Sequence, residues 1–307
     1  MPMSFPSFPD PRGLAGPVLL AGDSRNAFRD PAALWHAGVL HLFLTWVYPG
    51  PDGEPFLVVA KTTSADLRHW SPLRRLTPED RAANYSSPGS VVRHQDAWYL
   101  ALQTYPRPRG EKYGNQDSRI WTMRSTDLEN WEAPTLLRVK GPEVPFEAMG
   151  RMIDPFLLPD RDDPGQYWCF FKQNGVSLSR SNDLESWTFE GHTEAGENAC
   201  VLVHKGDYWL FHSPENGIGV KRSHDLRNWQ DLGVLTLGQD QWPWARGRLT
   251  AGFVLDGGPG TPGPRYLMFF HGSGPENEET LFDSNASIGI AYSHDLKAWN
   301  WPGESGL

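Results

Sequence analysis

Short segments in which apolar and polar residues alternate recur along the whole chain, separated by turn-forming Gly, Pro, Asn and Asp. Alternation with a period of two predicts β-strands that are buried on one face. The clearest examples are GVLHLFLT at 38–45, DAWYLALQ at 96–103, QYWCFFK at 166–172, DYWLFHS at 207–213 and RYLMFFHG at 265–272. A second β-type segment follows each of them, which indicates antiparallel neighbours.

A turn motif, S-x-D-L-x-x-W, closes the second segment of each unit. Its five copies lie at 64–70, 125–131, 181–187, 223–229 and 293–299. The Ser and Asp side chains can accept hydrogen bonds from backbone amides of a turn, and Leu and Trp can pack between neighbouring sheets. Recurrence of one unit along the chain is typical of radially repeated folds, so we interpret the motif as structural.

Each repeat unit contains enough β-type segments for four strands. A third segment precedes the other two, beginning DPAAL, SPGSVV, DPFLLP, ENACVLV and TAGFVLD, and one strand is expected after the motif. The sequence therefore predicts an all-β fold, a five-bladed β-propeller with four-stranded antiparallel blades around a central funnel. We expect one domain over 1–307, with an N-terminal extension at 1–22 and blades at roughly 23–75, 76–140, 141–192, 193–237 and 238–303.

The innermost strand of every blade lines the channel of a propeller, so equivalent side chains at its entry converge. Aligning the five units on their hairpins matches the positions Asp30, Ser87, Asp154, Glu197 and Thr250. Three carboxyl groups in one narrow funnel repel one another and lose hydration, so at least one should have a raised pKa. That cost favours a functional cluster over three independent strand caps.

A second ring of side chains is predicted at the ends of the next strands. Its members are Thr45, Gln103, Lys172, Ser213 and His271. A cation such as Lys172 would keep one acid ionised, and the His271 imidazole could bind an axial metal ion or water. A structural core histidine is the alternative for His271.

The composition and net charge of the chain make some classes of binding partner unlikely. The chain of 307 residues has 31 Gly, 27 Pro and 14 Trp, a mixture that suits short strands and turns, and its net charge of -9 disfavours nucleic acids and anionic membranes as partners. Cys169 and Cys200 are too few for a disulfide framework, so we expect reduced, buried thiols. The N-terminal residues lack a basic segment followed by an apolar one, and we expect a cytoplasmic protein. The oligomeric state is left open.

From Asp23 to Trp299 the sequence resembles glycoside hydrolase family 43 and, more broadly, the five-bladed propeller glycosidases that include the family 32 invertases. The resemblance lies in Arg29-Asp30-Pro31, Asp154-Pro155, the Glu197 that opens ENACVLVHKGDYWLFHS, and the repeated Ser-x-Asp-Leu turn. It implies hydrolysis of a glycosidic bond with inversion.

In that reaction Asp30 would be the general base, Glu197 the general acid and Asp154 the residue that modulates the pKa of the acid. The resemblance also implies that His271 lies near the axis, where the family often holds a calcium ion; no cofactor is required. The expected substrates are short arabinofuranosyl or xylosyl oligosaccharides attacked at a chain end.

Sugar specificity should come from aromatic and hydrogen-bonding side chains around the funnel. The candidate substrate-binding residues are Arg29, Trp46, Tyr85, Ser87, Arg151, Trp242 and Arg248, with Asn84 and Trp244 as further members. Arg248, directly before the innermost strand of blade five, is the leading candidate for gripping a sugar hydroxyl or carboxylate.

Three other functions fit the same residues. A retaining fructosidase-type enzyme would use Asp30 as nucleophile, with Glu197 as acid. A non-catalytic carbohydrate-binding propeller would use the funnel for binding alone, and a phosphorolytic glycosidase would replace the attacking water with phosphate.

Overall fold

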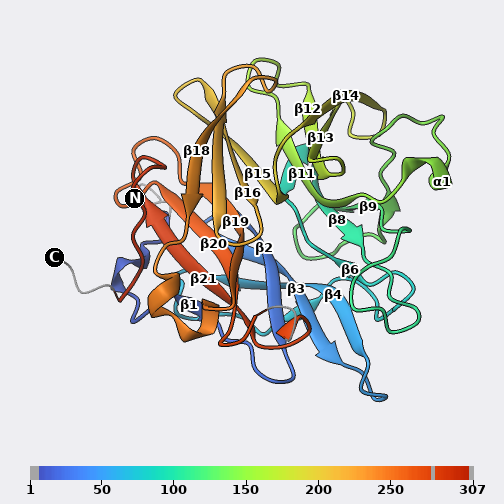
Figure 1. The fold of residues 1–307 in the computed structure, drawn as a ribbon. Helices are drawn as coiled ribbons and strands as arrows, with labels where there is room; N and C mark the ends of the chain where they lie inside the picture. The colour runs from blue at the N-terminus through green and yellow to red at the C-terminus, as the bar shows by residue number, and fades with distance from the viewer. Residues whose placement is uncertain (1–6, 278–280, 304–307) are drawn as a thin grey trace.

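The computed structural model describes residues 7–277 and 281–303, which form five antiparallel sheets arranged in a ring (Figure 1). The predicted all-β, five-bladed propeller is confirmed. Blade 1 consists of β2 (Ala27–His36), β3 (Val39–Pro49), β4 (Pro55–Ser64) and β5 (Arg74–Arg75). Blade 2 consists of β6 (Tyr85–Ser86), β7 (Val91–His94), β8 (Ala97–Thr104), β9 (Ile120–Ser125) and β10 (Thr135–Leu136), with β6 and β7 both paired to β8.

The other three blades have four strands each. Blade 3 consists of β11 (Ile153–Pro159), β12 (Tyr167–Lys172), β13 (Val176–Ser181) and β14 (Trp187–Thr193). Blade 4 consists of β15 (Glu197–His204), β16 (Asp207–Ser213), β17 (Ile218–Ser223) and β18 (Trp229–Leu235). Blade 5 consists of β19 (Arg248–Asp256), β20 (Tyr266–Ser273), β21 (Ala286–Ser293) and β1 (Val18–Leu20).

Helical structure in the described residues is short. It comprises α1 (Phe146–Met149) and the 3-10 turns η1 (Pro11–Gly13), η2 (Gln239–Gln241) and η3 (Pro243–Ala245). None of these helices could cross a membrane.

Strand β1 corrects the predicted domain boundaries. Residues 1–22 were expected to lie outside the blades, yet β1 pairs with β21, with Val18 opposite Gly289 and Leu20 opposite Ile288. Figure 1 shows β1, from the blue end of the chain, beside β21 near the red end. The N-terminal strand therefore completes the last blade. Because its partners are more than 250 residues away, no local pattern could reveal this pairing.

The repeated turn has the structural role that its residues predict. In the first copy, the Leu67 N–H donates to Ser64 Oγ (2.8 Å), and Asp66 Oδ1 accepts from the backbone of Arg68 and His69. Leu67 adopts a positive φ of 64° and is 2% exposed, which places its side chain between sheets. The motif Trp packs on the blade before it: Trp131 lies edge-on to Phe43, with ring centroids 5.7 Å apart. The turn thus joins neighbouring blades.

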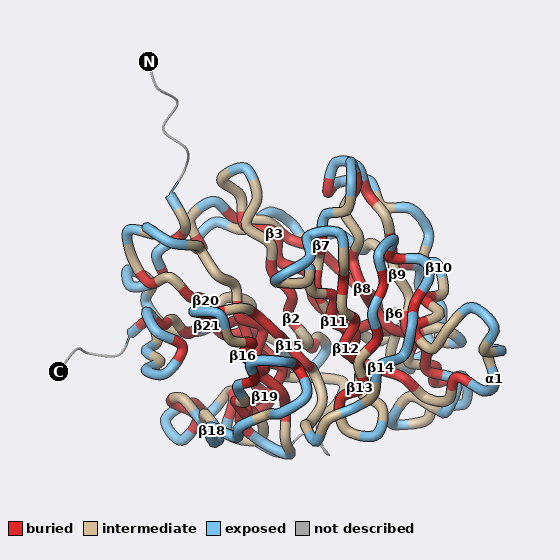
Figure 2. Tube along the Cα trace, turned by 90° about the horizontal axis from the view of Figure 1, so that it is seen from above, coloured by how far each residue is buried: buried red, intermediate tan, exposed pale blue. Residues whose placement is uncertain are grey.

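Buried residues concentrate on the strands around the axis, and exposed residues lie on the outer strands and loops (Figure 2). Both cysteines are buried and free, as expected. Cys200 also joins two blades, since its sulfur accepts a hydrogen bond from the Val254 N–H (3.2 Å). Burial raises the pKa of the Cys200 thiol to about 12, so this sulfur stays protonated.

A candidate active site on the propeller axis

A cavity of about 460 Å³ lies on the axis and is lined by residues of all five blades. Asp30, Asp154 and Glu197 all line it, from the innermost strands β2, β11 and β15. The three carboxyl groups that sequence analysis singled out therefore share one space. The second-ring residues Thr45, Gln103, Lys172 and His271 line the same cavity.

The innermost strands bend where the acids lie. At the equivalent place in each blade one non-glycine residue has a φ between 43° and 54°, in the left-handed region. Four of these residues lie within the innermost strand and Ser87 directly follows β6: Asp30, Ser87, Asp154, Asn198 and Ala251. In blades 1, 3, 4 and 5 the pairing with the second strand shifts register at this residue, which is the mark of a β-bulge. We call these five positions the bulge residues. A bulge re-aims its side chain, and here it turns Asp30 and Asp154 toward the cavity.

The bulges correct the alignment made from sequence. Glu197 and Thr250 were matched to Asp30 and Asp154, but the bulge residues of blades 4 and 5 are Asn198 and Ala251. Glu197 instead pairs with Ser213, as Arg29 pairs with Thr45 in blade 1. Asp30 precedes the hairpin glycine Gly38 by eight residues, and Asn198 precedes Gly206 by eight, whereas Glu197 precedes Gly206 by nine. The sequence alignment followed the acidic residue type and was therefore displaced by one position in blade 4.

Hydrogen bonds connect the bulge residues around the ring. In four blades the backbone N–H of the bulge residue donates to a second-ring side chain of the preceding blade. These bonds are Asp30 to His271 Nδ1 (3.1 Å), Ser87 to Thr45 Oγ1 (2.8 Å), Asp154 to Gln103 Oε1 (2.6 Å) and Ala251 to Ser213 Oγ (2.9 Å). In blade 4 the Asn198 N–H donates to Asp154 Oδ2 instead (3.3 Å). The ring offsets the strain of a left-handed backbone, which is on the order of 1 to 2 kcal/mol per residue.

Asp154 is the most perturbed of the three acids. It is 6% exposed, and its Oδ1 accepts a hydrogen bond from Ser87 Oγ (2.8 Å). Burial, followed by the charges of Glu197 and Asp30, raises the pKa of Asp154 to about 7. The hydrogen bonds from Ser87 and from the Asn198 backbone offset part of that rise. This direction agrees with the expectation that lost hydration and mutual repulsion raise the pKa of at least one acid.

Asp30 is held from two blades. Its Oδ2 accepts a hydrogen bond from Thr45 Oγ1 (2.9 Å), and its backbone N–H bonds to His271 of blade 5. Because His271 Nδ1 accepts this bond and lies 3.7 Å from Asp30 Oδ1, only the other ring nitrogen could bind a metal. Among the described residues no group of three or more His, Cys, Asp or Glu could hold a metal ion. The calcium ion expected at His271 stays a prediction.

Gly196, the residue before Glu197, is held in place by its neighbours and so fixes the backbone position of Glu197. The Gly196 N–H donates to His212 Nδ1 (3.0 Å), and a Cβ added to Gly196 would lie 1.7 Å from the Ser213 carbonyl oxygen. Burial lowers the pKa of His212 to about 4, so its imidazole is neutral and can accept this bond. Only glycine fits here, and His212 anchors it.

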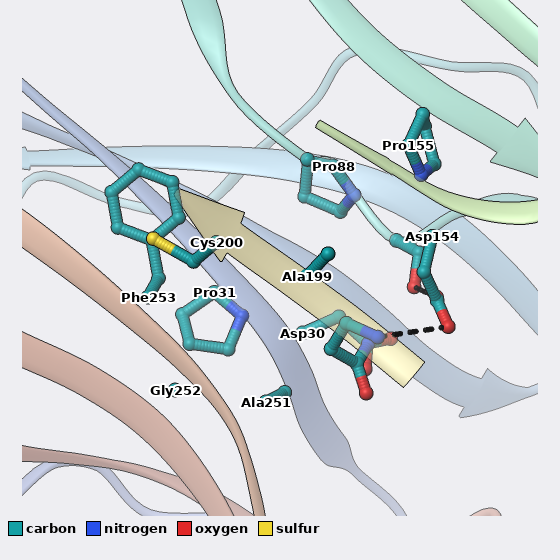
Figure 3. A pocket seen from close by; sticks show the side chains of 13 residues that line it. Asp30, Pro31, Pro88, Asp154, Pro155, Ala199, Cys200, Ala251, Gly252 and Phe253 are labelled. Carbon is teal, nitrogen blue, oxygen red and sulfur yellow. Dashed lines mark hydrogen bonds between the residues drawn. The ribbon is translucent and has the colours of Figure 1, made fainter. Parts of the chain in front are cut away.

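Below the acids the axis narrows. In Figure 3 the carboxyl groups of Asp30 and Asp154 lie at one end of a small space of about 30 Å³, and Cys200 and Phe253 lie at the other. The bulge residues of three blades are each followed by proline: Pro31, Pro88 and Pro155. The space on this side of the acids is therefore much smaller than the cavity of about 460 Å³ on the other.

With this geometry established, comparison with solved structures is informative. The chain has the fold of the family 43 glycoside hydrolases. One thermostable family-43 glycoside hydrolase has a TM-score of 0.61 and 14% identity, over 93% of this chain and 95% of that one. A β-xylosidase gives 0.60 and 13%, over 87% and 92%. An α-L-arabinofuranosidase from Podospora anserina, in complex with cellotriose, gives 0.61 and 15%, over 93% and 96%.

The fold expected from the sequence resemblance is thus found in structures with very different sequences. No protein-family model matches the chain, and no curated protein matches it either.

Four of the predicted substrate-binding residues line the cavity: Arg29, Ser87, Arg151 and Arg248. Arg29 donates to the Phe282 carbonyl (2.7 Å), and its guanidinium lies 4.3 Å from the centroid of the Phe282 ring, so it holds a loop as well.

The other predicted rim residues pack elsewhere. Trp242 is 7% exposed, and the rings of Trp242, Trp244 and Phe270 all stack on one another, so neither tryptophan is a sugar platform. Trp46 donates to Asn26 Oδ1 and contacts Tyr48, and Tyr85 lies edge-on to Trp121. Asn84 is fully buried and accepts from the Leu57 N–H. These contacts correct the prediction that Trp46, Tyr85 and Trp242 bind substrate, because blade packing uses their rings.

Loop residues that the sequence did not single out complete the cavity. They are Tyr105, Tyr113, Gly114, Gln116 and Phe282. Tyr113 is 45% exposed and lies edge-on to Phe282 at 5.0 Å, which makes it the accessible aromatic ring at the mouth. Tyr113 and Phe282 lie in long polar segments between strands, where no periodic pattern of the sequence selects one residue.

Proposed function

We propose that this protein is a glycoside hydrolase whose catalytic groups are Asp30, Asp154 and Glu197. The observation that carries the proposal is that three carboxyl groups, from three different blades, line one axial cavity of about 460 Å³. Acetal hydrolysis needs a protonated carboxyl at the leaving oxygen and an ionised carboxylate on the other face of the sugar. The glycoside hydrolases of the same fold support the proposal.

The surroundings of the acids favour a division of roles. Asp30 accepts a hydrogen bond from Thr45, which orients its carboxyl group and suits a general base that activates water. Glu197 is the general acid. Asp154, buried and sharing charge repulsion with both, modulates the proton affinity of the other two and orients the site. With water as the nucleophile, the reaction proceeds with inversion.

The proposed substrates are short oligosaccharides with a terminal arabinofuranosyl or xylosyl unit. The space below the acids is only about 30 Å³, too small for a sugar unit, which supports attack on a chain end rather than within a chain. The names of the β-xylosidase and the α-L-arabinofuranosidase support pentose units.

Activity on nitrophenyl α-L-arabinofuranoside and β-D-xylopyranoside tests the proposal. Asp30→Asn and Glu197→Gln should each lower kcat by at least ~100-fold, the scale of lost acid–base catalysis. Glu185→Gln, which removes an exposed carboxylate of a blade 3 turn, is the matched control and should retain activity. If the Glu197 variant keeps full turnover, Glu197 is not the acid.

The stereochemical course is read from the first-formed anomer by NMR. Inversion agrees with Asp30 as base, whereas retention would assign Asp30 as a nucleophile. Sugar binding without hydrolysis of any glycoside would instead identify a carbohydrate-binding propeller.

A further inference from the structure

One residue of the second ring cannot accept a backbone hydrogen bond as the other four do. In four blades the second-ring side chain accepts the N–H of the next bulge residue. In blade 3 this position is Lys172, the last residue of β12, opposite Ile153. An ammonium group has three donors and no acceptor, so it cannot receive the Asn198 N–H. Asp154 Oδ2 receives it instead, and Lys172 takes no part in the ring.

Lys172 is not held by another protein group. Its side chain is half-buried and lines the cavity, yet its ammonium makes no hydrogen bond or ion pair with any residue of the described ranges 7–277 and 281–303. Lys61, a buried lysine on β4 of blade 1, shows the usual solution: its ammonium donates to the Leu128 carbonyl and to Glu129 (both 2.6 Å). A partly desolvated cation without an acceptor costs free energy, which a bound anion would recover.

The location of Lys172 indicates which part of a substrate it would meet. Lys172, Glu197 and Arg248 line both the axial cavity and the wider opening that continues from it toward solvent. They come from blades 3, 4 and 5, so the proposed general acid lies between cations contributed by the blades on either side. Arg151 adds a further positive charge to the cavity wall. A general acid faces the leaving oxygen, so this is the leaving-group side of the site.

We propose that the leaving sugar of the natural substrate carries an anionic group, a carboxylate or a sulfate ester, which binds to Lys172 in the opening that Arg248 also lines. The leaving-group assignment rests on the proposed function, but the anion site itself does not. A neutral substrate would leave Lys172 unpaired after it had displaced water from the cavity. An anionic one supplies the missing acceptor and fixes its orientation relative to Glu197.

Monosaccharide binding tests the site without hydrolysis. Isothermal titration calorimetry of the whole protein would compare D-glucuronate, D-galacturonate and the 6-sulfates of glucose and galactose with neutral glucose and galactose. At least one anionic sugar should bind roughly 10-fold or more tightly than its neutral counterpart, the scale of charge-assisted hydrogen bonds. The uronate and sulfate arms identify which anion the site prefers.

Lys172→Met should abolish the difference between anionic and neutral sugars while leaving neutral-sugar binding unchanged. Lys172→Arg should preserve part of the preference, and Lys297→Met, at an exposed turn, is the control. The proposal is overturned if anionic and neutral sugars bind equally, if no anionic sugar binds, or if Lys172→Met weakens both classes alike. Anion binding without hydrolysis of any glycoside would contradict the proposed hydrolase function and support the anion site. Hydrolysis without a preference for anionic sugars would support the hydrolase function and contradict the anion site.

Discussion

Replacing Asp154 by asparagine should change how the stability of the fold depends on pH. The pKa of this carboxyl is raised from 3.8 to about 7, mainly by burial and then by Glu197 and Asp30. A raised pKa means that the folded protein holds the proton more tightly than the unfolded chain does. The stability it contributes is therefore fully present below pH ~4 and is lost as pH rises through about 7.

The magnitude follows from the size of the shift. A change of roughly 3 pKa units corresponds to about 4 kcal/mol at ~1.36 kcal/mol per unit. Integrated from pH 5 to pH 8, the wild-type free energy of unfolding should fall by about 2 to 3 kcal/mol from this group alone. Asp154→Asn also weakens the bond from the Asn198 N–H, a cost of about 1 kcal/mol, but that cost does not depend on pH.

Urea unfolding of both proteins at pH 5, 6, 7 and 8 would measure the effect. The stability of Asp154→Asn relative to wild type should increase by about 2 to 3 kcal/mol across this range. Asp240→Asn makes the same change in charge at an exposed position and serves as the control. If the unfolding free energies of Asp154→Asn and wild type depend on pH in the same way, the pKa of Asp154 is not raised in the folded state. The reasoning about burial and charge repulsion at the axis would then be wrong.

Two further predictions concern the ring and its closure. Thr45→Val removes the hydroxyl that donates to Asp30 and accepts from Ser87, so unfolding free energy should fall by about 1 to 3 kcal/mol in urea titrations. Thr122→Val, where the buried hydroxyl has no hydrogen-bond partner in the described part of the chain, should cost nothing; equal losses in both variants would contradict the ring. Deleting residues 1–20 removes β1 and exposes β21, so the thermal midpoint should fall by several degrees at least. An unchanged midpoint would show that the last blade is stable with three strands.

Much of the fold was readable because its information is local and repeated. Five copies of the Ser-x-Asp-Leu-x-x-Trp turn each satisfy their own backbone amides, bury their Leu and pack their Trp on the core, so every copy reports the same structure independently. The alternating segments add strand positions on both sides of each turn. Asp30, Asp154 and Glu197 lie near the entries of innermost strands, so a five-bladed arrangement was enough to predict that they meet at one axis.

The tertiary structure decided what depends on contacts between distant segments. The bulges that turn Asp30 and Asp154 toward the cavity are stabilised by side chains of the preceding blade, and β1 joins blade 5 through partners at the far end of the chain. The same limit explains the tryptophans: Trp46 and Trp242 read as sugar platforms by residue type, but neighbouring rings occupy their faces. The sequence by itself determined the repeat, the blades and the three acids, because a strand and a turn are set by nearby residues. Which side chains face the substrate, and that Lys172 stands outside the hydrogen-bonded ring, were decided only when the blades closed, since the partners of those groups come from other blades.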